Sequence, residues 1–348
     1  MGVAETFFGS VNEIGGQPNR TDGRTNERTD SSATVRPPGL FLRFSSFVST
    51  KMASGHYEVW HSSQSVGYPI FYLPYEYDDK WALEKRVWNP AQAKWLHPVF
   101  IRHWHISFFL VFLYIAGIHY LKWWMRDRKP FGLRNFLVFW NAGLAIFSIF
   151  GALRFSEEFL YVMKNRSFQD SVCLSISPTQ PAALWAFLFS LSKVAEFGDT
   201  VLLVLRKRPL IFLHWFHHSV VLIYSWHSAT ELTAAGRWFI QLNYSVHAIM
   251  YTYYTFASLG FRFPKWVSMT VTTLQTTQML IGVFISLYVA RLKLFSSRPT
   301  VCQQSVENMC ICFSIYTAFA FLFIRFFVNS YLLGKKPTAA KAVAKKAQ

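Results

Sequence analysis

Histidines at helical spacing are the residues of this sequence best suited to chemistry. One segment reads His214-Trp-Phe-His217-His218, and side chains at i, i+3 and i+4 share one face of a helix. His247 follows in the next apolar segment. A neutral imidazole in an apolar site is both a nucleophile and a proton acceptor near neutral pH. We therefore predict that these four histidines form a reaction centre, for which acyl transfer is the best-fitting chemistry.

Acidic, basic and amide side chains accompany the histidines on neighbouring segments. Lys193, Glu196 and Asp199 follow one another at steps of three, with Thr200 next, so they lie on one helical stripe. An ionisable side chain in mid-membrane costs about 2.5–3.5 kcal/mol on insertion scales, which makes it a candidate for function. For Glu196, a structural ion pair is an equally good interpretation. The other polar candidates lie on the two segments that follow the histidine motif: Asn243, Tyr251, Tyr254, Gln275 and Gln278.

Long apolar segments must position these side chains. The chain is 52% hydrophobic and only 15% charged, whereas about a quarter of the residues of a soluble domain are charged. Apolar runs of roughly twenty residues are long enough to cross a bilayer as helices. We predict an all-α membrane protein with seven transmembrane helices, at about 105–121, 135–153, 182–205, 210–228, 236–259, 266–290 and 308–332.

The net charge of +17 indicates cytosolic loops rather than a nucleic-acid partner. The basic residues form short clusters between the apolar runs, and the sequence contains no nucleic-acid-binding motif. Positive residues gather in the cytosolic loops of membrane proteins. The clusters after the first, third and fifth spans and in the C-terminal tail therefore predict a non-cytosolic N-terminus and a cytosolic C-terminus.

Two features of the non-cytosolic loops fit this orientation. Asn165-Arg-Ser in loop two is a glycosylation sequon, as is Asn19-Arg-Thr in the N-terminal tail. Cys173 in loop two and Cys302 in loop six share the oxidising side, where a disulfide between them would persist. The cysteines have no spacing typical of a zinc site, so we expect no metal.

The two ends of the chain differ from its centre. Residues 1–60 are rich in Gly, Ser, Thr, Asn and Arg, which predicts a disordered tail. Residues 90–334 are the expected membrane domain, and residues 335–348 a basic cytosolic tail. The chain ends Lys345-Lys346-Ala-Gln, the register of the di-lysine retrieval signal. We therefore expect a multi-pass protein of the endoplasmic reticulum membrane.

Two other functions could use a histidine-rich helical bundle. Metal-dependent membrane oxygenases and desaturases bind iron through several histidine boxes, whereas this chain has a single HxxHH segment and too few ligands. A receptor or transporter with seven helices is the second alternative. Three imidazoles on one helix face disfavour it.

Taken together, these motifs resemble the ELO fatty-acid elongases. The matching segments are Lys193-xx-Glu196-xx-Asp199-Thr200, Leu213-His214-Trp-Phe-His217-His218, Asn243-xxx-His247-xx-Met250-Tyr251-x-Tyr253-Tyr254 and Thr272-xx-Gln275-xx-Gln278. The resemblance runs from about residue 90 to the end. Where family members often have Pro-Glu-Leu, this chain has Ala195-Glu196-Phe197, a change that spares the charged residue.

The resemblance implies a seven-helix bundle that encloses an acyl tunnel opening to the cytosol. It implies an acyltransferase, a very-long-chain 3-oxoacyl-CoA synthase, that condenses acyl-CoA with malonyl-CoA and releases carbon dioxide and CoA. Both CoA esters are substrates, so no cofactor is expected. The expected partners are the bilayer and the 3-oxoacyl-CoA reductase, dehydratase and enoyl reductase of the elongation cycle, and a homodimer is compatible with the resemblance.

In the expected mechanism, His217 attacks the acyl thioester to give an acyl-imidazole. Donors among His247, Asn243 and His218 would stabilise the malonyl-derived enolate, and His214 either takes part or orients its neighbours. Arg206, Lys207 and Arg208 would attract the CoA phosphates. The residues from Leu210 to His218 resemble the branch acting on saturated and monounsaturated chains, with a polyunsaturated-chain elongase as the alternative.

Overall fold

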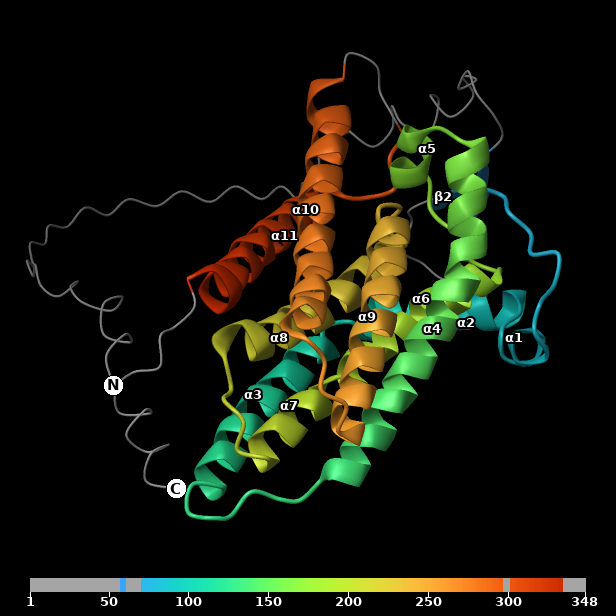
Figure 1. Ribbon diagram of the computed structural model, residues 1–348. Coiled ribbons are helices and arrows are strands. Elements are labelled where there is room, and N and C mark those ends of the chain that lie inside the picture. Colours follow the sequence, from blue (N-terminus) through green and yellow to red (C-terminus); the bar gives the residue numbers. More distant parts are fainter. Residues whose placement is uncertain (1–56, 61–69, 297–300, 334–348) are drawn as a thin grey trace, which may run out of the picture. The chain divides into compact units, whose positions relative to one another are not determined.

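The computed structural model describes residues 57–60, 70–296 and 301–333, most of which are helical (Figure 1). The helices are, in chain order, α1 (Ala82–Val87), α2 (Pro90–His103), α3 (Ile106–Trp124), α4 (Arg134–Asn165), α5 (Phe168–Cys173), α6 (Pro181–Ala195), α7 (Phe197–Leu205), α8 (Phe212–Glu231), α9 (Gly236–Leu259), α10 (Lys265–Phe295) and α11 (Val306–Phe327), followed by the π-helical turn η1 (Val328–Leu332). The N-terminal sequon at Asn19 and the di-lysine pair Lys345 and Lys346 lie outside the described residues.

A small antiparallel sheet adds to the predicted helices. Strand β1 (Glu58–Trp60) pairs with strand β2 (Ile70–Tyr72), with Val59 opposite Phe71. A bridge then joins Tyr72 to Ser175 in the loop after α5. The predicted disordered tail, residues 1–60, therefore overlaps β1, because its last three residues are extended and paired.

Helices of transmembrane length indicate a multi-pass membrane protein. Within the described residues, four are long and apolar enough to cross a bilayer: Ile106–Trp124, Arg134–Asn165, Lys265–Phe295 and Val306–Leu332. Helices α8 and α9 lie at two of the other predicted spans and contain the polar motif residues. The prediction of seven spans therefore stays a prediction for those segments.

The third predicted span consists of two helices, α6 and α7, which meet at Glu196. The Glu196 amide donates to the Ser192 carbonyl four residues earlier, but the Asp199 amide donates to the Glu196 carbonyl three residues earlier. Glu196 keeps helical dihedral angles, φ −59° and ψ −16°. The chain thus tightens locally at Glu196 rather than breaking, a distortion often found at functional positions.

Helices α4 and α9 pack along each other in antiparallel fashion. Arg237 at the start of α9 binds Glu158 near the end of α4, whereas Arg134 at the start of α4 donates to the Ser258 carbonyl near the end of α9. Gly151 of α4 lies directly under the ring of Tyr244, and a side chain there would overlap that ring. Small residues allow such close helix approach in membranes, and here the approach fixes the position of α9 and its motif residues.

Candidate active site

Glu196 lies where side chains from three helices meet. The Lys193 ammonium donates to Glu196 Oε1 at 2.6 Å, and His247 Nδ1 of α9 lies 3.7 Å from the same oxygen. His218 Nδ1 of α8 lies 3.9 Å from Glu196 Oε2. Lys193 and Glu196 are each only 3% exposed. One buried carboxylate therefore faces imidazoles from two neighbouring helices.

The Glu196 carboxylate also favours one tautomer of each facing imidazole. A carboxylate attracts the ring nitrogen that bears a proton, so the proton of both His218 and His247 is favoured at Nδ1. Nε2 of each ring then keeps its lone pair and can accept a proton. Among the described residues, Glu196 Oε2 has no hydrogen-bond partner, so this oxygen has an unused acceptor site toward His218.

Lys193 extends the site to Asn243 on α9. Its ammonium donates to Asn243 Oδ1 at 2.9 Å. Because an ammonium can only donate, the amide oxygen must face Lys193, and the NH2 group of Asn243 remains available as a donor. Lys193 therefore orients two acceptors at once, the Glu196 carboxylate and the Asn243 amide.

A cavity of about 160 Å³ begins at this polar cluster and continues between apolar side chains. His217, Asn243 and Gln278 are among its lining residues, and the rest of the lining is mainly aromatic and aliphatic. It is bordered by α2, α6, α8, α9, α10 and α11. A mainly apolar pocket that carries a few polar residues suits a molecule with a reactive head and a hydrocarbon chain.

His214 binds the hydroxyl group of Thr200 and does not line this cavity. Thr200 Oγ1 of α7 lies 3.0 Å from His214 Nε2 and 2.7 Å from the Tyr114 hydroxyl of α3. The rings of His214 and His218 meet edge to face, with centroids 4.6 Å apart. This arrangement supports a role for His214 in orienting His218.

Asp199 binds neutral donors. Trp140 Nε1 of α4 donates to Asp199 Oδ1 at 2.6 Å, and the Tyr251 hydroxyl of α9 donates to Asp199 Oδ2 at 2.7 Å. The Tyr251 ring packs edge to face on His247, with centroids 5.4 Å apart, and Tyr254 packs edge to face with Tyr251 at 6.4 Å. Asp199 is thus connected to His247 through Tyr251.

The remaining predicted site residues are two glutamines of α10 and the basic triplet after α7, which consists of Arg206, Lys207 and Arg208. Gln278 lines the cavity, whereas the Gln275 side chain donates to the Met250 sulfur. The basic triplet after α7 lies at the surface, where Lys207 donates to the carbonyl of Arg126 in the loop after α3. Trp140 and Tyr114, the partners of Asp199 and Thr200, could not be singled out from the sequence, because single aromatic residues in apolar helices carry no functional signal.

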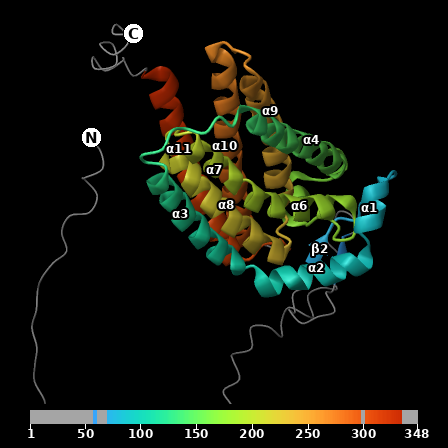
Figure 2. The same ribbon diagram turned by 90° about the horizontal axis from the view of Figure 1, so that it is seen from below.

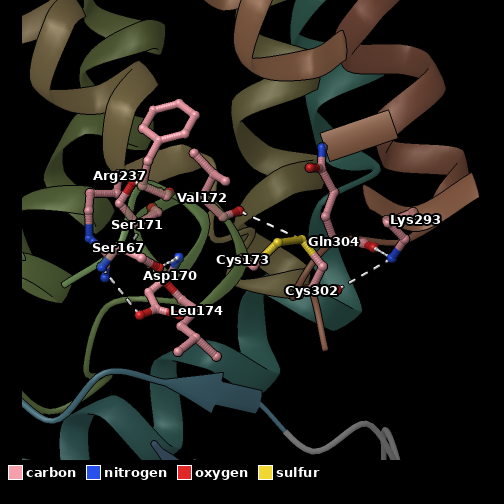
Figure 3. The surroundings of a disulfide bond; sticks show 11 residues. Ser167, Asp170, Ser171, Val172, Cys173, Leu174, Arg237, Lys293, Cys302 and Gln304 are labelled. Carbon is pink, nitrogen blue, oxygen red and sulfur yellow. Dashed lines mark hydrogen bonds between the residues drawn. A yellow bond between two sulfur atoms is a disulfide. The ribbon is translucent and has the colours of Figure 1, made fainter. Parts of the chain in front are cut away.

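A disulfide between Cys173 and Cys302 ties α5 to the loop before α11 (Figure 3). The nearby Arg237 guanidinium binds Glu158 and donates to the carbonyl groups of Ser171, Leu174 and Ser175. Arg237 and Glu158, both fully buried, were also missed from the sequence, because each has its partner on a distant segment. Within the described ranges, His, Cys, Asp and Glu form no group arranged to hold a metal ion.

Comparison with known proteins agrees with this arrangement of motifs. The sequence profile of the GNS1/SUR4 family, ELO, matches residues 99–339. Putative fatty acid elongase 4 of Caenorhabditis elegans is 49% identical over 245 residues, which cover 70% of this chain and 83% of the relative. Very long chain fatty acid elongase 6 of Drosophila melanogaster is 41% identical over 241 residues (69% and 75%), and its namesake in Gallus gallus is 38% identical over 264 residues (75% and 96%).

The match spans more than half of the chain, and it includes the helices from which the polar cluster is built. This chain is therefore a multi-pass membrane protein of the ELO family of fatty acid elongases.

Proposed function

We propose that the protein is the condensing acyltransferase of fatty acid elongation, a very-long-chain 3-oxoacyl-CoA synthase. It joins an acyl-CoA to malonyl-CoA and releases carbon dioxide and CoA, and it needs no cofactor because both partners are substrates. One observation carries the proposal: His217 and Asn243 line an apolar cavity beside a cluster in which two further imidazoles face one carboxylate.

The first half-reaction is acylation of His217. A ring nitrogen of His217 attacks the thioester carbon, the carbon–sulfur bond breaks, and CoA leaves as the thiol after taking a proton. His217 is the histidine of the motif that lines the cavity, which supports it as the nucleophile. The neighbouring His218 has a lone pair free to accept the imidazole proton if its own proton is held at Nδ1 toward Glu196.

The second half-reaction is condensation. Malonyl-CoA loses carbon dioxide to give an enolate. The enolate carbon attacks the acyl carbon, and the bond between the acyl carbon and the His217 imidazole breaks. The developing oxyanion needs donors that are fixed in advance. The Asn243 amide supports this role, because its oxygen is already held by Lys193 and its NH2 group remains free. His247, on the same helix face, becomes a second donor once its Nε2 has taken up a proton.

In this proposal, five residues support the reacting groups without contacting the acyl chain: Lys193, Glu196, Asp199, Thr200 and Tyr251. Glu196 faces two imidazoles, and Tyr251, which donates to Asp199, packs against His247. The basic triplet after α7 and the loop after α3 are joined by the Lys207 bond, and we assign the CoA phosphates to this cationic surface.

The proposed setting is the endoplasmic reticulum membrane, with the C-terminus cytosolic. The basic loops and the Cys173–Cys302 disulfide on the opposite side support this orientation. A reductase, a dehydratase and an enoyl reductase would consume the 3-oxo product. The preferred substrates are long saturated or monounsaturated acyl-CoAs, by the resemblance of the histidine motif.

The direct test is incubation of the purified protein with labelled malonyl-CoA and a panel of saturated, monounsaturated and polyunsaturated acyl-CoAs. Mass spectrometry should show 3-oxoacyl-CoA two carbons longer than the acyl donor. With acyl-CoA alone, intact-mass analysis should show one acyl group on the protein, and His217→Ala should abolish it. An active enzyme that never carries the acyl group would refute the acyl-imidazole, and loss of activity with a chelator would favour metal chemistry.

A further inference from the structure

The cavity extends well beyond the motif residues, and its far part is formed in part by a segment outside the matched family region. Trp88, Ala93, Leu96 and His97 line it, and all four precede residue 99, where the family match begins. Three of them belong to α2, and Trp88 lies between α1 and α2. Figure 2 shows α2 running beside α6 and α8.

Several contacts fix α2 against the C-terminal end of α8. His97 Nε2 lies 3.0 Å from the Thr230 carbonyl. The Phe100 ring packs on Trp226 of α8 and on Phe187 of α6, with centroids 5.4 Å apart in each case. Through these contacts, the α2 residues that line the cavity, here called the α2 wall, lie at the level of the last turns of α8.

Because His97 contacts Thr230 of α8, the distance along α8 from His217 to Thr230 gives the depth of the cavity below His217. Thr230 follows His217 by thirteen residues (230 minus 217), which corresponds to about 20 Å along a helix that rises about 1.5 Å per residue. A carbon–carbon bond of about 1.52 Å at a tetrahedral angle advances an extended chain by about 1.25 Å. An extended acyl chain of about sixteen carbons therefore reaches from His217 to the α2 wall.

A buried ionic contact holds the segment before α2 in place. Glu84 of α1 accepts hydrogen bonds from the Arg154 guanidinium at 2.8 and 2.6 Å and from Trp185 Nε1 at 2.9 Å. Burial acts to raise the pKa of Glu84, but these hydrogen bonds outweigh it and lower the pKa. Just beyond α1, Trp88 Nε1 donates to the Pro178 carbonyl at 3.2 Å. Contacts at both ends of residues 84–97 thus hold the wall against the helical bundle.

We propose that the wall formed by Trp88 and α2 limits the length of the acyl chain, with Leu96 as a specificity-determining residue. This inference rests on the proposed function, because it assigns the cavity to the acyl chain bound at His217. It places length selection in residues that the family profile does not cover.

The test compares chain-length profiles of purified variants on saturated acyl-CoAs of 12 to 20 carbons, with labelled malonyl-CoA. Leu96→Ala enlarges the far end and should raise the activity on the longest chains relative to 14 carbons about tenfold. Leu96→Trp fills it and should lower the activity on 18 carbons relative to 12 about tenfold. Val99→Ala is the matched control, since Val99 lies on the same helix, is also half-buried and does not line the cavity.

Opposite shifts in the two Leu96 variants, with an unchanged profile in Val99→Ala, would support the wall. The same profile in wild type and both Leu96 variants, or an equal shift in the control, would overturn it. If Leu96→Trp does not fold, Leu96→Ala alone decides between these outcomes. Failure of the proposed function is distinct, because wild-type protein would then form no 3-oxo product at any chain length.

Discussion

The Lys193–Glu196 pair allows the structural and catalytic contributions of a buried charge to be separated. We consider three variants: Lys193→Met, Glu196→Gln and the double variant that carries both changes. Each single change leaves one charged group without its partner, whereas the double variant leaves two neutral side chains of similar size. Both residues are 3% exposed, so water cannot replace the lost partner.

The distance between the charges sets the scale of the effect. At the 2.6 Å between Lys193 Nζ and Glu196 Oε1, Coulomb attraction is about 6 kcal/mol for an effective dielectric constant of about 20. Desolvation offsets much of this attraction, and removal of one partner of a buried pair typically costs about 3–5 kcal/mol. Replacement of both partners is often neutral. We therefore expect each single variant to be about 3–5 kcal/mol less stable and the double variant to recover most of that loss.

Thermal unfolding of the purified protein in detergent, followed by tryptophan fluorescence, measures the change in stability. At about 2 °C per kcal/mol for a chain of this size, each single variant should unfold roughly 6–10 °C below wild type. The rate of condensation by the protein that remains folded measures the change in activity. Because Glu196 faces His218 and His247, we expect Glu196→Gln and the double variant to be about 10²–10⁴-fold slower.

The two measurements together can refute the reasoning. A double variant that regains activity along with stability would show that the pair only carries its helix through the membrane. Single variants as stable as wild type would show that the charges are not buried as a pair. As a control, Ser192→Ala removes a neighbour 3.3 Å from Glu196 Oε1 without changing any charge, and it should lower the unfolding temperature by only a few degrees.

Other features of the structure lead to three further predictions. Arg237→Met leaves Glu158 unpaired and removes one hydrogen-bond donor from each of three carbonyl groups, so it should lower the unfolding temperature at least as much as Lys193→Met; an unchanged temperature would contradict this. Cys302→Ser removes the disulfide to Cys173, so non-reducing peptide mapping should lose that linked pair, and the half-life of activity at 37 °C should shorten. Asn165 is exposed at the end of α4, and Asn165→Gln should abolish an endoglycosidase-sensitive band shift in microsomes; a wild-type band insensitive to the enzyme would disprove glycosylation there.

The motif residues could be predicted because their spacing alone places them on helix faces. His214, His217 and His218 share a face by periodicity, and the step of three between Lys193 and Glu196 predicts their contact. The structure joins Lys193 to Glu196 as this spacing suggests. It adds what spacing cannot give, the convergence of α8 and α9 on one carboxylate.

Partners on other helices could not be predicted from one sequence. Trp140 donates to Asp199 across 59 positions and Tyr114 binds Thr200 across 86, and both aromatic residues look like ordinary membrane-facing side chains. Arg154 followed the predicted end of the second span at residue 153. The helix in fact continues to Asn165, and the charge of Arg154 is neutralised by Glu84, which lies far away in the sequence.

The segment from β2 to α2 escaped prediction for a different physical reason. It has no sustained apolar period, and Pro98 within α2 normally marks the end of a helix because proline lacks the amide donor. Such a segment is ordered mainly by contacts with the finished bundle, such as those of Glu84 with Arg154 and Trp185. Residues that perform the chemistry must keep a fixed spacing, because they act on the same few atoms. Residues that only border the end of a hydrocarbon chain need to supply volume, and many sequences can do so. The proposed catalytic groups can therefore be recognised from a motif, whereas the residues that we propose to limit chain length become visible only once the cavity is known.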